Sequence, residues 1–266
     1  MCIRDSFPPV DTKLGSAPNL LVISPRDRIE RIEEILLKPS ISLSTIEHIE
    51  NTLLLEQNLS AVVIELGGIA TYPSSIAEMD TLEDILITVS HEWIHHYLFF
   101  HPLGQSIYKD SQMTTLNESI AVILGNEIGR KVWEEIKLNN NCILIDRLNN
   151  QEEDIVKYDS FNFNMVMQET REKVDEYLQH DEIKMAENYM NNQRDLFKSN
   201  GYPIRKINQA YFSFYGTYAN RPESISLTYR YLLEIRNKLS SLYEFVAIMQ
   251  DISSYEEFLS IYNELI

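Results

Sequence analysis

One row of apolar residues most constrains the fold of this chain. The row follows the i, i+4, i+7, i+11 spacing of a stripe that a helix buries against a neighbour. It consists of Leu82, Leu86, Val89 and Trp93. The pattern predicts a helix from about residue 81 to 100, ended by Pro102 and Gly104.

The first third of the chain mixes short strands with helices. Two apolar runs predict strands, Leu20–Ser24 and Ala61–Leu66, and the second run ends at Gly67 and Gly68. Between these runs we expect two helices. The first has an apolar side, which consists of Ile29, Ile32, Ile35 and Leu36. The second extends from about Ser44 to Glu56.

The rest of the chain has a helical pattern almost throughout. One helix is predicted from about Thr115 to Lys137, and the pattern resumes near Phe161 and continues to the end. The fold class is therefore expected to be α+β, with a small N-terminal sheet, two central helices and a mostly helical C-terminal half.

Composition excludes several classes of function. The net charge is -17, from 23 Lys and Arg against 40 Asp and Glu, and no basic cluster offsets it. Such a charge repels phosphate backbones, so nucleic acid is not an expected partner. The cysteines are Cys2 and Cys142 alone, which excludes a disulfide framework or a cysteine-rich metal cage. A metal would have to be held by His, Asp or Glu.

The helix predicted at residues 81–100 carries His91, Glu92 and His95 in the HExxH arrangement. Histidines four apart on a helix project from one face, so their imidazoles can bind one Zn²⁺ ion. Glu92 is placed to take a proton from a metal-activated water without binding the metal. The alternative is a helix whose surface histidines have this spacing by chance.

A catalytic zinc needs a third protein ligand and one open position. Glu118 is our candidate, because residues 96–117 suffice for a loop and a returning helix. Its carboxylate should then lie within about 5 Å of both histidine ring nitrogens. Alternatively, Thr115 and Glu118 have the spacing of a capping box, so that Glu118 would only cap its own helix.

These motifs resemble those of the gluzincin metallopeptidases, the thermolysin-like and aminopeptidase-like group. The resemblance covers roughly residues 60–220 and rests on His91-Glu92-x-x-His95 and Asn117-Glu118-x-x-Ala121. It implies zinc held by His91, His95 and Glu118, with Glu92 as general base and acid. It also implies that the strand Ala61–Leu66 and the following glycine loop resemble the edge strand that pairs with a peptide substrate.

The competing family is that of the metzincins, since His101 gives the spacing HExxHxxxxxH. The metzincin pattern has glycine where this chain has Leu98, and leucine resists the left-handed turn that would bring His101 back to the metal. Glu118 is preferred for this reason. More loosely, the C-terminal part resembles a group of bacterial proteins assigned as zinc aminopeptidases, through Arg171, Tyr177, Met185 and Asn208–Tyr211.

A row of polar and aromatic residues downstream offers a further catalytic candidate. Its spacing, i, i+3, i+7, i+10, places one asparagine and three tyrosines on one helix face; they are Asn208, Tyr211, Tyr215 and Tyr218. A tyrosine hydroxyl can stabilise the oxyanion that forms in amide hydrolysis, and Tyr215 is central on this face. The alternative is that the three rings pack against neighbouring helices, with their hydroxyls at the surface.

The N-terminus carries two further expectations. Met1–Ser6 resembles a translated sequencing adapter, which would mean that the native start, with any signal peptide or membrane anchor, is missing. We therefore expect three parts: residues 1–18 as artefact and linker, 19–138 as a zincin-like catalytic core, and 139–266 as a helical C-terminal subdomain.

The expected function is zinc-dependent hydrolysis of a peptide or protein substrate, with Glu92 as general base. A zinc-binding scaffold without catalysis would keep the metal ligands but would not need Glu92. A helical interaction protein would bind no metal.

Overall fold

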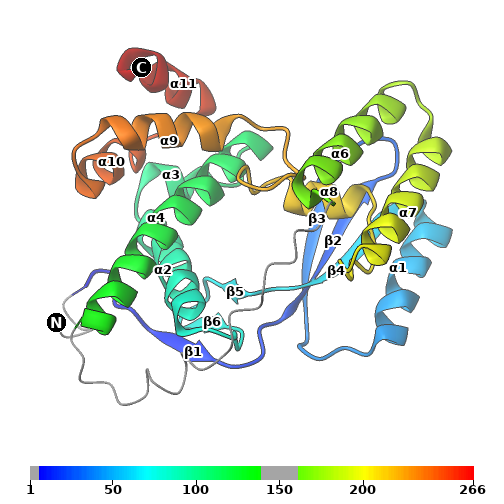
Figure 1. The fold of residues 1–266 in the computed structure, drawn as a ribbon, viewed down its shortest axis with the longest axis horizontal. Coiled ribbons are helices and arrows are strands. Elements are labelled where there is room, and N and C mark those ends of the chain that lie inside the picture. The colour runs from blue at the N-terminus through cyan, green and yellow to red at the C-terminus, as the bar shows by residue number, and fades with distance from the viewer. Residues whose placement is uncertain (1–5, 139–160) are drawn as a thin grey trace. The chain divides into compact units, whose positions relative to one another are not determined.

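A computed structural model of the chain describes residues 6–138 and 161–266 (Figure 1). It confirms the α+β fold, with small sheets in the first third of the chain and helices in the C-terminal half. Both cysteines and most of the adapter-like segment, residues 1–5, lie outside the described residues. Among the described helices, none is long and apolar enough to cross a membrane.

The chain forms two compact units, and each unit combines segments that are distant in the sequence. The first unit consists of Met1–Ala17, Gly67–Tyr158 and Thr228–Ile266. The second consists of Pro18–Leu66 and Asp159–Leu227. The sequence predicted a boundary at residue 138 between two parts that are each continuous in the chain. In the structure, the contacts group Thr228–Ile266 with the first unit.

The second unit is built on an antiparallel sheet with the strand order β3-β2-β4. Its strands are β2 (Asn19–Pro25), β3 (Glu33–Leu37) and β4 (Leu59–Glu65). The two strands predicted from their apolar runs correspond to β2 and β4, and these lie side by side, with Val22 opposite Val62.

The helix expected around Ile29–Leu36 was wrong, because residues 29–32 form a connection and β3 begins at Glu33. Ile35 pairs with Leu21 of β2, and Leu36 pairs with Leu20. The apolar spacing suits a helix as well as a strand. The short connection after β2 lets the segment fold back and hydrogen-bond to β2, and this pairing overrides the local preference.

Helices cover both faces of this sheet (Figure 1). Helix α1 (Leu43–Gln57) packs on the face that carries Leu21 and Val63. The opposite face, with Leu20 and Val62, packs against three later helices. These are α6 (Phe163–Gln179), α7 (Ile183–Ser199) and α8 (Gln209–Tyr215).

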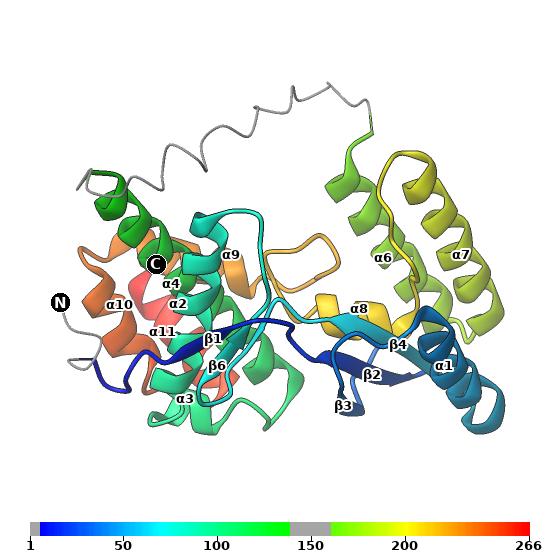
Figure 2. The ribbon, with the colours of Figure 1, turned by 90° about the horizontal axis from the view of Figure 1, so that it is seen from below.

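The first unit contains a second small sheet with the order β1-β6-β5. Its strands are β1 (Thr12–Leu14), β5 (Gly68–Ile69) and β6 (Ser74–Ile76). Figure 2 shows β1 and β6 side by side, and they pair in parallel. The segment expected as an extended linker therefore contributes a strand to this unit.

Two long helices form the centre of the first unit, α2 (Leu82–Leu98) and α4 (Ser111–Leu138), joined by the short helix α3 (Pro102–Gln105). Three C-terminal helices cover them and share one apolar core with them. These are α9 (Thr228–Lys238), α10 (Leu242–Met249) and α11 (Tyr255–Leu265).

Candidate metal centre

Helix α2 positions the two histidines of the motif. Thr81 caps its N-terminus by accepting a hydrogen bond from the backbone N–H of Asp84 at 3.0 Å. The helix continues without a break to Leu98, which is buried. His91 and His95 are therefore one turn apart on the same side, and their Nε2 atoms lie 3.1 Å from each other.

Helix α4 brings Glu118 to the histidine pair. This helix begins at Ser111, and the Asp110 carboxylate accepts a hydrogen bond from the N–H of Met113 at 2.8 Å. Asp110 is thus the residue that caps α4, and Glu118 lies two turns further in. The capping-box alternative for Thr115 and Glu118 was wrong, because the predicted helix start was four residues too late.

Close approach of α2 and α4 depends on a buried glycine. A Cβ atom at Gly125 would lie 3.0 Å from the Cα and Cβ atoms of His91, closer than most side-chain contacts allow. Gly129, one turn later, would meet Ile87 of α2 at 2.5 Å in the same way. Two glycines four residues apart therefore let the backbones approach near the first histidine.

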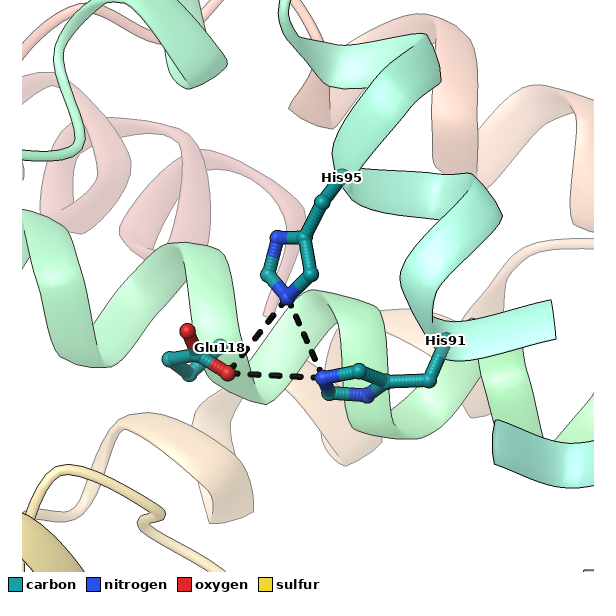
Figure 3. A group of neighbouring side chains, drawn as sticks. All are labelled: His91, His95 and Glu118. Atoms are coloured by element: carbon teal, nitrogen blue, oxygen red, sulfur yellow. Dashed lines mark hydrogen bonds and ion pairs between the residues drawn. The ribbon is translucent and has the colours of Figure 1, made fainter. Parts of the chain in front are cut away.

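His91, His95 and Glu118 form a compact group that can hold a metal ion (Figure 3). The Oε2 atom of Glu118 lies 3.5 Å from Nε2 of His91 and 3.5 Å from Nε2 of His95. One ligand atom from each residue lies within 4.8 Å of the others. The predicted placement of Glu118 within about 5 Å of both ring nitrogens is confirmed.

The arrangement of the three side chains suits the binding of a cation. The Oε2 atom of Glu118 is buried and has no hydrogen-bond partner among the residues that the structure describes. Ligand bonds to a metal such as zinc are about 2 Å long, so atoms separated by about 3–4 Å can surround one ion. Each of the three side chains is only 15–17% exposed, which leaves the group reachable but largely shielded.

Asn117 orients one of the two histidines. Its Oδ1 atom lies 3.0 Å from Nδ1 of His95, on the side of the ring that faces away from Glu118. An amide oxygen only accepts, so Nδ1 carries the proton and donates it. The Nε2 atom of His95 is then the one available to a metal.

The electrostatics of the group favour a positive charge at its centre. Burial lowers the pKa of His95, but the charge of Glu118 outweighs this effect and raises the pKa of His95 to about 9. Burial likewise raises the pKa of Glu118, but the charge of His95 and the contacts with both histidines hold it well below its usual range. Either a proton or a bound cation can supply this charge.

Glu92 lies beside this group without belonging to it. Its side chain is buried, with 7% of the residue exposed. Burial raises the pKa of Glu92, the charges of His91 and His95 oppose this shift, and Glu118 adds to it, so that the net pKa is raised. A carboxyl group whose pKa moves toward neutrality is suited to accept and return a proton.

The other histidines of this region lie elsewhere. His101 immediately precedes α3, and its ring centroid lies 4.6 Å from that of Tyr97. It is not in the group that can hold a metal among the described residues. His96 faces the loop after β5, where its Nε2 atom lies 2.8 Å from the carbonyl oxygen of Thr71.

Tyr215, the second predicted catalytic residue, belongs to the other unit. It is the last residue of α8, and the Arg221 guanidinium lies 4.5 Å from its ring centroid. The structure shows no hydrogen bond to its hydroxyl among the described residues. Burial raises the pKa of Tyr215, while the charge of Arg221 opposes that shift. The proposed oxyanion role of Tyr215 stays a prediction.

The tyrosine row does not form one continuous helix face. Asn208 caps α8 by accepting from the backbone N–H of Tyr211 at 2.9 Å, and Tyr218 lies beyond the helix end. The hydroxyl of Tyr211 donates to the buried Glu223 carboxylate at 2.7 Å. The ring of Tyr211 packs in the core, as the alternative expected, but its hydroxyl is buried and not at the surface.

Sequence reasoning missed two features of the site. The role of Asn117 as partner of His95 could have been inferred from its position before Glu118, since both residues lie on the face toward α2. The close approach at Gly125 had a signal as well, because glycines four apart inside a helical pattern indicate a contact with a neighbouring backbone.

We compared the chain with protein-family models, curated proteins and solved structures, and none of the three comparisons finds a significant match. The resemblance to gluzincin metallopeptidases therefore stays a prediction from the two motifs.

Proposed function

We propose that this protein is a zinc-dependent hydrolase of peptide bonds, with His91, His95 and Glu118 as metal ligands and Glu92 as general base. The observation that carries the proposal is the convergence of three ligand atoms within 4.8 Å, with a buried carboxylate beside them. A group with this composition has the parts that hydrolysis by metal-activated water requires.

The donor set supports zinc as the metal. Two imidazoles and one carboxylate are a ligand set that catalytic zinc sites use, and they leave the fourth position of a tetrahedron open. A calcium or magnesium site would be built mainly from oxygen atoms. The Asn117 contact with His95 adds the outer hydrogen bond that is typical of metal-binding histidines.

In the proposed mechanism, His91, His95 and Glu118 would hold a zinc ion, which as a Lewis acid would lower the pKa of water to near 7 and polarise a carbonyl group. Glu92 accepts a proton from the attacking water and later returns it to the leaving amine. The two histidines and Glu118 hold their positions throughout.

The strand next to Glu92 supports an extended peptide as the substrate. In the order β1-β6-β5, one side of β5 has no partner strand among the described residues. Gly68 lies opposite Ile76, and the N–H of Ala77 donates to the carbonyl of Gly67 at 2.8 Å. In this pattern, the N–H and C=O groups of Gly68 point away from β6, where a peptide strand can pair with them.

The expectation from the sequence covered both the strand Ala61–Leu66 and the glycine loop after it. The strand is β4, at an edge of the other sheet and in the other unit, and the proposal rests on the glycine loop. The short strand β5, which begins within the glycine loop, is the one that lies next to Glu92.

The first test is the metal content of the purified protein together with its activity on a set of fluorogenic peptides. We expect about one zinc ion per chain, and hydrolysis that is lost on chelation and restored by added zinc. Glu92→Gln should keep the zinc and lose activity by a factor of about 10²–10⁴. Glu83→Gln, on the same helix but more exposed, is the matched control and should keep both.

The outcomes separate the rival functions. Zinc binding without hydrolysis of any peptide would favour a zinc-binding scaffold, and absence of zinc after reconstitution would favour a metal-free interaction protein. A Glu92→Gln protein that hydrolyses peptides at the wild-type rate would refute the assigned base.

A further inference from the structure

Gly68 of β5 lies directly against the Glu92 carboxylate. A Cβ atom at this position would lie 2.5 Å from Oε1 and 3.1 Å from Cδ of Glu92. It would also lie 2.9 Å from the Cγ2 methyl group of Thr88, one turn earlier on α2. Any side chain at position 68 would therefore occupy the space in which the carboxylate lies.

The neighbouring glycine has no such restriction. A Cβ atom at Gly67 would meet only the Cε atom of Met79, at 3.4 Å, which is an ordinary contact. Neither glycine has a positive φ angle, the backbone conformation that side chains rarely adopt. The requirement for glycine at position 68 is thus steric and concerns Glu92.

Packing is what holds the Glu92 carboxylate in place. Among the described residues, the structure shows no hydrogen bond to this carboxylate. Thr88, by contrast, is fixed, since its hydroxyl donates to the carbonyl of Asp84 at 2.9 Å and its methyl group faces Gly68. The carboxylate and this methyl group therefore both lie against the side of Gly68 that a Cβ atom would occupy.

We propose that Gly68 is a positioning residue for Glu92, because its missing side chain leaves the space that the carboxylate needs beside the metal ligands. The inference rests on the proposed function, in which Glu92 must reach the attacking water. The atom that a methyl group at position 68 would meet first is Oε1 of Glu92, at the end of a flexible side chain. Substitution should therefore displace the carboxylate rather than unfold the protein.

The experiment compares Gly68→Ala with Gly67→Ala in the full chain reconstituted with zinc. For Gly68→Ala we expect zinc affinity and thermal midpoint near the wild-type values, an unchanged KM, and a kcat lowered about 10²-fold, the effect of a displacement on the order of 1 Å. Gly67→Ala should match the wild-type protein in all four quantities. An unchanged kcat in Gly68→Ala, or an equal loss in both variants, would overturn the proposal.

Crystal structures of the two zinc-loaded variants give a readout that is independent of activity. The Glu92 carboxylate should be displaced by on the order of 1 Å in Gly68→Ala and should keep its position in Gly67→Ala. A carboxylate at its original place in Gly68→Ala refutes the inference even if no peptide is hydrolysed. If the wild-type protein is inactive while the carboxylate moves as expected, the proposed function fails and the positioning role stands.

A double variant covers the case in which Gly68→Ala does not fold. Gly68→Ala/Thr88→Ser removes the methyl group that the new side chain would meet at 2.9 Å, and it retains the Thr88 hydroxyl group. The contact with the Glu92 carboxylate is kept. The same loss of kcat and the same displacement are expected, and their absence would refute the proposal.

Discussion

The Nδ1 atom of His95 lies 3.0 Å from Oδ1 of Asn117, the residue that precedes Glu118 on α4. Two consecutive residues of one helix thus act on the same imidazole from opposite sides. Asn117 accepts a hydrogen bond from one ring nitrogen, and Glu118 lies 3.5 Å from the other.

We expect Asn117→Ala to weaken zinc binding about 10–100-fold, as loss of such an outer hydrogen bond does in metal sites. Asn117→Asp keeps the accepting oxygen and should bind zinc nearly as tightly as the wild-type protein. Ser119→Ala is a matched control, because Ser119 is buried on the same helix and its hydroxyl has no hydrogen-bond partner in the described part of the chain. Competition with a chromogenic chelator measures all three affinities. Equal affinities for the Ala and wild-type proteins would contradict the role of Asn117.

The identity of the third ligand is tested by Glu118→Ala and His101→Ala. Removal of Glu118 takes away one of the three ligand atoms, and we expect zinc affinity to fall by about 100-fold or more. Removal of His101, whose ring packs against Tyr97, should leave the affinity nearly unchanged. Isothermal titration of the metal-free proteins with zinc decides whether Glu118 or His101 is the third ligand. The opposite ranking would favour the metzincin assignment.

Stability in acid should depend on Glu50, a buried carboxylate on α1. Burial raises its pKa, but the hydrogen bonds of Arg205 and the charge of Lys206 outweigh the burial, so the pKa of Glu50 is lowered in the folded state. A lowered folded-state pKa means that the stabilisation is complete above the unfolded value of about 4.5 and is lost as the pH falls below it.

Glu50→Gln should therefore lower the free energy of unfolding at pH 7 by about 3 kcal/mol, since both cations lose their partner. The difference between variant and wild type should shrink as the pH falls below about 4.5. Urea unfolding curves at pH 7 and pH 4 measure both quantities. Glu47→Gln, an exposed position on the same helix, is the control. A difference that does not change with pH would contradict the ionic role.

Two tyrosines of α8 should respond differently to loss of their hydroxyl groups. Tyr211→Phe removes the donor to the buried Glu223, so we expect a loss of about 1–3 kcal/mol in the free energy of unfolding. Tyr215→Phe should change stability little and, if Tyr215 serves the oxyanion, should lower kcat about 10²–10³-fold at an unchanged KM. Steady-state kinetics and thermal unfolding of both variants separate these effects. A full kcat in Tyr215→Phe would leave packing as its only role.

The features that could be predicted from the sequence depend on local spacing. The apolar row from Leu82 to Trp93 marks α2, and the β-branched run at Ala61–Leu66 marks a strand. The approach of Glu118 to the histidines also followed from local patterns, since two amphipathic helices joined by a short connection pack side by side.

The remaining features depend on contacts between distant residues, which local spacing does not encode. The segment Ile29–Leu36 has a pattern compatible with a helix and a strand, and pairing with β2 decides the outcome. Arg236 of α9 binds Glu127 of α4 at 2.6 Å, and no local pattern indicates this partnership. Contacts of this kind join segments that are distant in the sequence into one compact unit.

The first unit combines an early and a late segment of the chain, and this affects when the metal centre is completed during synthesis. The ribosome has added all three ligands by Glu118, but Leu232, Ile235 and Phe245 share one core with Leu116 and Ile120. At about 5–20 residues per second, these late residues follow on the order of ten seconds afterwards. Until then, the nascent chain presents its ligands on helices whose apolar sides lack their cover. Capture of the metal by a packed centre therefore has to follow the synthesis of these late residues.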